Sequence, residues 1–155
     1  MTRAATGPIA TLVASRARRA VRVRRRPATP AELAAHIVPG YRITPTIALI
    51  SDALADAVTL PDQRLIITTP PRTGKSVLIS EVGPVFALSR NLDTKVILTS
   101  YPDTLAQEHS HAARALITEH VELLGFRLRS DKAAVGRWAS RATAAVCWPP
   151  ESYRV

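Results

Sequence analysis

The chain has 155 residues, 46% of them hydrophobic and 21% charged, with a formal net charge of +9 at pH 7. This length suits one domain with a tail, and the apolar fraction excludes a chain that is disordered throughout. The longest uninterrupted apolar runs have four or five residues, whereas a membrane-spanning helix needs roughly 20, and no secretory signal is evident, so we expect a soluble, cytoplasmic protein with no membrane partner.

The chain begins with an arginine-rich arm. Residues 1–31 contain eight arginines and no acidic residue, whereas residues 32–155 contain 13 basic and 12 acidic residues. We expect residues 1–28 to form a disordered basic arm that precedes the domain. Such an arm could follow a nucleic-acid backbone by releasing counterions. The alternatives are a solvated tail, a targeting-like segment and a start codon assigned too far upstream.

Two helices with similar N-terminal signals follow the arm. Thr29-Pro30-Ala31-Glu32 is a capping box with proline at the first helical position, which predicts a short helix ending near Val38. Thr44-Pro45 repeats the signal. Apolar residues then recur at helical spacing as far as Val58, which predicts a second helix over residues 45–58.

Two apolar runs are typical of buried strands, namely Leu65-Ile66-Ile67-Thr68 and Val96-Ile97-Leu98-Thr99. Each precedes a predicted helix, the first from about Lys75 to Ser89 with an interruption at Gly83-Pro84, and the second from about Thr104 to His120. The order strand, helix, strand, helix implies right-handed crossovers between parallel strands. We therefore expect an α/β fold with a parallel sheet and flanking helices.

The segment between the first predicted strand and its helix has features of a phosphate-binding loop. Such a loop directs several backbone N–H groups at one anion, and uses a lysine for the outer phosphates and a hydroxyl for Mg²⁺. Gly74-Lys75-Ser76 provides the end of the pattern G-x-x-x-x-G-K-[ST], although Thr69 replaces its first glycine. An ordinary exposed helix start is the alternative. The predicted binding residues are Thr69, Pro70, Pro71, Arg72, Thr73, Gly74, Lys75 and Ser76.

This segment resembles a known family. Residues 64–76, an apolar run leading into Pro-Pro-Arg-x-Gly-Lys-Ser, resemble the variant Walker A segment of bacteriophage terminase large subunits, the ATPases that drive DNA into capsids. Residues 95–106 are similar to the second strand and following helix of that family, and the resemblance extends over residues 41–138. It implies a partial P-loop NTPase-type fold, with ATP and Mg²⁺ as cofactors. The implied partners are double-stranded viral DNA, the portal and the small terminase subunit, in the cytoplasm of a bacterial host cell.

The resemblance also assigns roles to single residues. Lys75 would contact the β- and γ-phosphates of ATP, and Ser76 would ligate Mg²⁺. Arg72 matches a loop arginine that acts near the γ-phosphate as an activating charge, and a surface cation is the alternative. The helix over residues 45–58 takes the place of the segment on the adenine side, with packing alone as the alternative.

The catalytic acids of this class are missing from the sequence. Hydrolysis needs an apolar strand ending in an aspartate for Mg²⁺ and an adjacent acid to position water. The run Val96-Ile97-Leu98 instead ends in Thr99-Ser100, and Glu119 and Glu122 fall on or just past a helix. We also expect the chain to lack the nuclease domain of terminases. We expect an N-terminal fragment that binds ATP-Mg weakly and hydrolyses it poorly or not at all. His109 and His111 diverge on a helix and are expected to be solvated.

Residues 141–155 break from the preceding pattern and include the only cysteine, Cys147, which excludes an internal disulfide. Read one nucleotide later, this segment permits a glycine-rich stretch that resembles terminases, so we hypothesise a frameshift near Ser140 and an irregular tail. The ATPase part would then span residues 29–140. Two other interpretations remain open, a non-enzymatic basic DNA-binding or assembly protein that acts through the arm, and an inert prophage remnant.

Overall fold

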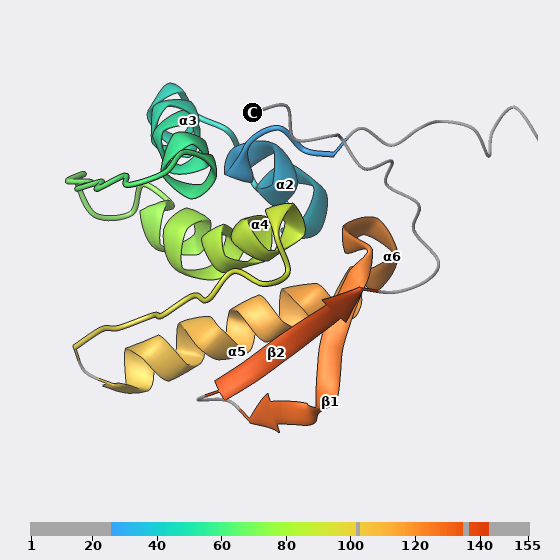
Figure 1. The fold of residues 1–155 in the computed structure, drawn as a ribbon. Helices are drawn as coiled ribbons and strands as arrows, with labels where there is room; N and C mark the ends of the chain where they lie inside the picture. The colour runs from blue at the N-terminus through green and yellow to red at the C-terminus, as the bar shows by residue number, and fades with distance from the viewer. Residues whose placement is uncertain (1–25, 102, 135–136, 143–155) are drawn as a thin grey trace, which may run out of the picture.

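The computed structural model describes residues 26–101, 103–134 and 137–142. Over these ranges the chain forms a helical body followed by one antiparallel hairpin, and the hairpin lies against the helix that precedes it (Figure 1). In chain order the elements are α2 (Pro30–Ile37), α3 (Pro45–Thr59), the π-helical turn η1 (Val77–Val82), α4 (Gly83–Arg90), α5 (Asp103–Glu119), α6 (Val121–Leu124), β1 (Phe126–Ala134) and β2 (Arg137–Ala142).

The predicted α/β fold with a parallel sheet is wrong for the described residues, whose only sheet is the antiparallel pair β1–β2. The predicted strands over residues 65–68 and 96–99 belong to neither a helix nor a sheet. In Figure 1 they lie apart, the first near α3 and the second along α5. A β-branched run favours extended backbone, but a strand also needs a neighbouring backbone to bond. No described segment pairs with either run, and Ile66 and Ile97 are 93% and 87% exposed.

The two helix starts at Pro30 and Pro45 are confirmed, because their capping groups make the expected hydrogen bonds. The backbone N–H of Glu32 donates to Thr29 Oγ1 at 3.3 Å, and the N–H of Ala28 donates to Glu32 Oε2 at 2.7 Å. At the second start, the N–H of Ile47 donates to Thr44 Oγ1 at 3.3 Å. These side chains satisfy N–H groups that the first helical turn leaves without partners.

The interruption expected at Gly83-Pro84 takes the form of a π-helical turn. Proline has no N–H, and its ring would clash with the carbonyl four residues earlier in a regular α-helix. The backbone widens into η1 just before Pro84, and the N–H of Gly83 donates to the carbonyl of Leu78, five residues earlier. The helix then resumes as α4, so a single π turn accommodates the proline.

The core lies around η1 and α4, which pack against α2, α3 and α5. The residues Leu33, Leu78, Phe86, Ile117 and Phe126 are each at most 2% exposed. They come from four helices and from β1, so the buried cluster joins the hairpin to the helical body.

Two polar contacts fix neighbouring elements. The N–H of Ala31 in α2 donates to the buried Oγ of Ser51 in α3 at 2.8 Å. Trp138 Nε1 in β2 donates to Ser110 Oγ in α5 at 3.1 Å. Each bond joins two elements that also pack through apolar side chains.

Arg90 at the end of α4 holds the chain where it enters α2. Its Nη2 donates to the carbonyls of Pro27 and Ala28 at 2.7 and 2.8 Å, and its guanidinium lies 4.7 Å from the centroid of the Phe86 ring. A cation over an aromatic face is attracted by the ring quadrupole. The predicted arm over residues 1–28 lies outside the described residues, apart from its last three.

Among the described residues, no helix combines the length and the apolar character needed to cross a bilayer.

Candidate phosphate-binding loop

Residues 69–76 form a tight turn that leads directly into a helix. Arg72 and Gly74 have φ values of 63° and 84°, in the left-handed region. Helical bonding begins where the N–H of Leu78 donates to the carbonyl of Gly74 at 3.2 Å. A Cβ atom at Gly74 would lie 3.6 Å from Ile47 Cδ1, an ordinary contact, so the position favours glycine because of its φ rather than for lack of space. Arg72 adopts the same region without that freedom, which is uncommon for a residue with a Cβ.

Side-chain contacts close the base of the turn. Thr73 Oγ1 donates to the carbonyl of Pro70 at 3.2 Å and lies 3.3 Å from Thr69 Oγ1. With that proton used on Pro70, the Thr69 hydroxyl is the donor to Thr73. Thr69, which stands where the sequence pattern has its first glycine, therefore helps to hold the turn closed.

The loop presents a run of backbone N–H groups without acceptors. None of the N–H groups of residues 72–76 donates a hydrogen bond within the described part of the chain. These groups precede or begin the helix that continues as η1 and α4, and a helix N-terminus carries partial positive charge. Free amides at such a position are the elements of an anion site.

Unlike those of Thr69 and Thr73, the side chains of Arg72, Lys75 and Ser76 have no partner within the described residues. Arg72 and Ser76 are exposed and Lys75 is half-buried. Neither cation takes part in a salt bridge within the described residues, and the Ser76 hydroxyl makes no capping bond. No acidic residue occurs within residues 69–76. The loop therefore combines positive charge, free amides and a free hydroxyl on one exposed turn.

The described structure places no acidic group in this loop. Glu119 and Glu122 are exposed and belong to α5 and α6, and the described residues contain no group of three His, Cys, Asp or Glu side chains able to hold a metal ion. Within residues 69–76, the Ser76 hydroxyl makes no capping bond and is an oxygen that could serve as a metal ligand. The residues present fit phosphate binding and lack the acids of hydrolysis.

The helix expected on the adenine side, α3, lies beside the loop, since a Cβ at Gly74 would be 3.6 Å from Ile47 Cδ1, and it packs on η1 and α4. Ile47 is 1% exposed and belongs to the core. Packing therefore accounts for the described contacts of α3 with the loop.

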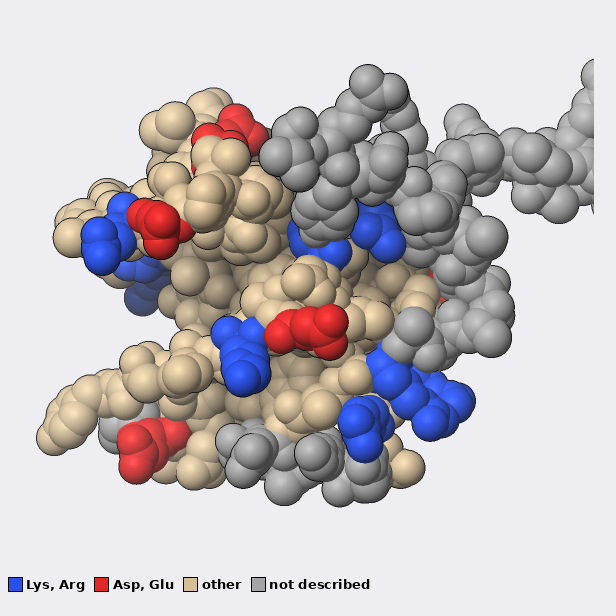
Figure 2. Space-filling view, in the orientation of Figure 1, with Lys and Arg blue, Asp and Glu red and all other residues tan. Residues whose placement is uncertain are grey.

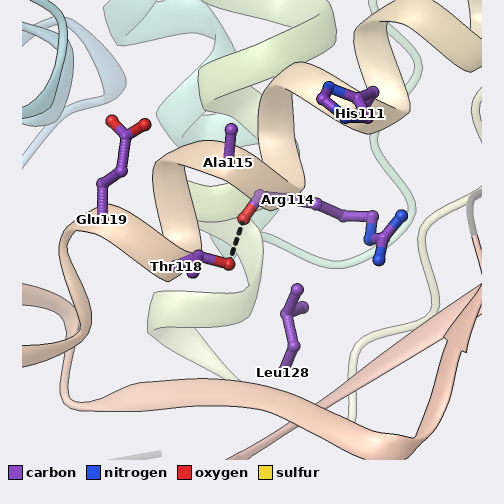
Figure 3. A pocket seen from close by; sticks show the side chains of 6 residues that line it. All are labelled: His111, Arg114, Ala115, Thr118, Glu119 and Leu128. Carbon is purple, nitrogen blue, oxygen red and sulfur yellow. Dashed lines mark hydrogen bonds between the residues drawn. The ribbon is translucent and has the colours of Figure 1, made fainter.

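A separate hollow of about 270 Å³ lies between α5 and β1 (Figure 3). It is lined by His111, Arg114, Ala115, Thr118, Glu119 and Leu128. Figure 3 shows Glu119 and the guanidinium of Arg114 on opposite sides, and the Thr118 hydroxyl donates to the carbonyl of Arg114 at 2.9 Å. The hollow contains none of the predicted site residues.

The two α5 histidines differ in environment. His111 is exposed, as predicted. The prediction of a solvated His109 is wrong, because its Nδ1 lies 3.1 Å from Oε1 of Glu81 in η1 and its side chain is only 15% exposed. Sequence spacing along α5 gave no sign of this pair, since Glu81 lies 28 residues earlier.

Comparisons of the chain with protein-family models, with curated proteins and with solved structures found no match. The resemblance to terminases accordingly depends on the residues of the loop and its surroundings.

Proposed function

We propose that residues 69–76 bind ATP-Mg²⁺ and that the chain is the N-terminal ATPase part of a terminase-type DNA-packaging protein. The observation that supports nucleotide binding is the closed turn, whose free amides over residues 72–76 lie beside Lys75 at a helix start. The Pro-Pro-Arg-x-Gly-Lys-Ser sequence of that turn is the basis for the lineage. Under this proposal the partners are viral double-stranded DNA, the portal and the small terminase subunit.

Each loop residue then has a specific task. The N–H groups of residues 72–76 donate to phosphate oxygens, and Lys75 adds a mobile charge for the outer phosphates. The Ser76 hydroxyl contributes an oxygen ligand to Mg²⁺, and Arg72 supplies positive charge at the exposed side of the turn. ATP-Mg²⁺ supplies the γ-phosphoryl group whose transfer to water drives this class of motor.

The described residues support binding without efficient turnover. Residues 69–76 contain no carboxylate, and the described residues contain no cluster of three acidic or other metal-ligating side chains. Catalysis of phosphoryl transfer depends on positioning water and neutralising charge, and both tasks need groups beyond this loop. We therefore expect nucleotide affinity with ATPase activity at the background rate.

The test is titration of the full chain with a fluorescent ATP analogue in the presence of Mg²⁺. Lys75→Ala should weaken binding about tenfold to a hundredfold, because a hydrogen bond to a charged group contributes about 1.5–3 kcal/mol. Lys95→Ala is the matched control, since Lys95 is exposed and lies outside the loop. Inorganic tripolyphosphate should compete with the analogue, whereas adenosine should not.

Undiminished binding by Lys75→Ala would contradict the assignment of the loop. Equal losses in Lys75→Ala and Lys95→Ala would point to non-specific attraction of the anion by the basic chain. Competition by adenosine as strong as that by tripolyphosphate would place recognition on the base, for which this loop has no described contact.

A further inference from the structure

The β1–β2 hairpin differs in charge from the helical body on which it packs. Residues 126–142 contain five basic residues and one acidic residue, whereas residues 27–125 contain seven basic and ten acidic residues. Figure 2 shows Lys and Arg side chains at the lower right, on the side where β1 begins and β2 ends in Figure 1. In residues 27–142, an excess of positive charge is therefore found in the β1–β2 hairpin and not in the helical body.

The strand register brings two arginines together. Arg127 in β1 and Arg141 in β2 are directly opposite each other, and both are exposed. Successive side chains of a strand point to opposite faces. Phe126 is 2% exposed within the core and Leu128 packs against the core, so the two arginines point to the face turned away from α5.

This pairing has a cost to the hairpin. Like charges directly opposite each other destabilise an antiparallel pair. Neither Arg127 nor Arg141 forms a salt bridge within the described part of the chain. The hairpin therefore carries an exposed pair of cations that the fold does not neutralise.

We propose that the exposed face of the β1–β2 hairpin binds the phosphate backbone of a nucleic-acid duplex. The forked guanidinium matches the oxygens of a phosphate, and the major groove of B-DNA admits a two-stranded β-ribbon.

A protein partner and a single strand fit this face less well. Protein interfaces usually centre on aromatic anchors, and single-strand sites stack bases on aromatic rings. The described aromatic residues of the hairpin are both used internally, because Phe126 is buried and Trp138 donates to Ser110 Oγ. Contacts of these arginines to phosphate oxygens would position the duplex without reading its sequence.

The test measures the affinity of the full chain for a 30-base-pair DNA duplex at several salt concentrations by fluorescence anisotropy. Each phosphate contact contributes about 0.9 to the slope of log affinity against log salt, so Arg127→Gln with Arg141→Gln should lower the slope by about 1.8. The arginines of residues 1–31 contribute equally in both proteins, so the difference reports on the hairpin. Arg42→Gln with Arg64→Gln is the matched control, since both arginines are exposed outside the hairpin, and should leave the slope unchanged.

A second variant separates binding from folding. Arg141→Glu places an acid opposite Arg127, which should keep or raise the melting temperature while the DNA salt slope falls. A melting temperature that is kept or raised while the DNA salt slope falls would exclude unfolding as the cause of weaker binding. A duplex RNA probe shows whether the backbone bound is that of DNA or is shared by both nucleic acids.

An unchanged salt slope in the double glutamine variant would overturn the proposal, and so would an equal drop in the matched control. Displacement of DNA by polyglutamate as effective, per charge, as displacement by unlabelled duplex would indicate an acidic protein partner instead. The proposal is independent of the nucleotide loop. Lys75→Ala should leave DNA affinity unchanged, and the hairpin variants should leave binding of the ATP analogue unchanged.

Discussion

Two sets of apolar residues in this chain have opposite environments. Leu78 and Phe86, in the helix formed by η1 and α4, are 0% exposed, whereas Ile66 and Ile97 in the extended segments are almost fully exposed. A helix satisfies its own backbone groups, so its apolar face needs only neighbouring side chains to become buried. An extended segment needs a neighbouring chain for its backbone and for its side chains. Of these two sets, the buried one therefore belongs to the segment whose backbone hydrogen bonds are local.

Of the variants considered, Phe86→Ala should cause the largest loss in the free energy of unfolding. Removing a fully buried phenylalanine leaves a cavity at the centre of the core, with an expected loss of about 3–5 kcal/mol in the free energy of unfolding. Ile66→Ala is the comparison, because it removes an exposed apolar side chain and should change stability by less than about 0.5 kcal/mol. Urea denaturation followed by far-UV circular dichroism measures both. Similar losses in the two variants would show that residues 65–68 are covered in solution.

The difference between local and distant backbone hydrogen bonding also explains which elements can be predicted from the sequence. The helices predicted over residues 30–38, 45–58 and 104–120 occur as α2, α3 and α5, with each boundary shifted by at most one residue. Their signals, namely capping side chains, proline at the first turn and helical spacing, act within a few residues of one another. Tertiary context is not needed to recognise them.

The sheet could not be predicted in this way, because pairing joins distant segments. The runs over residues 65–68 and 96–99 suggested parallel strands, but no described backbone lies in register with them. The hairpin was not predicted, although the alternation of apolar and basic residues over residues 126–129 is a strand signal. The register shift between Leu128 and Ala133 could not be read from that alternation.

For the loop, the sequence predicted the position but not the internal geometry. The Gly-Lys-Ser pattern located the helix start at Lys75. The contact between Thr69 and Thr73 and the left-handed backbone of Arg72 depend on how the turn closes. The frameshift hypothesis concerns mainly residues 143–155, which lie outside the described part of the chain. Arg141 and Ala142, which it also includes, belong to β2.

Ser51→Ala should have an intermediate effect, because it removes the contact between α2 and α3. The buried N–H of Ala31 would lose its acceptor, and an unsatisfied buried donor costs about 1–3 kcal/mol. The matched control is Ser89→Ala, since the Ser89 hydroxyl donates only to the carbonyl of Phe86 within its own helix. That change should cost less than about 0.5 kcal/mol. Equal losses in urea denaturation would show that the bond to Ala31 adds no stability.

The smallest predicted effect concerns Tyr41, whose side chain packs at the edge of the core next to α2. Its hydroxyl oxygen is buried and has no hydrogen-bond partner in the described structure. Burial raises the pKa of Tyr41 above the ordinary tyrosine value, because desolvation disfavours the phenolate. Tyr41→Phe removes the unsatisfied hydroxyl and should leave stability at neutral pH unchanged or higher by less than about 1 kcal/mol.

The pH dependence of stability distinguishes this residue from an exposed tyrosine. Below the ordinary tyrosine pKa of about 10, Tyr41 is protonated in both states and contributes no pH dependence. Above that value the unfolded chain loses the proton first, so the wild type should lose stability as pH rises, and Tyr41→Phe should lose less. Tyr101→Phe is the matched control, since Tyr101 is 98% exposed. Urea denaturation between pH 9 and 11 measures the free energy of unfolding of all three proteins. An equal decline in all three would show that the Tyr41 hydroxyl is solvated, and would contradict its burial at the edge of the core.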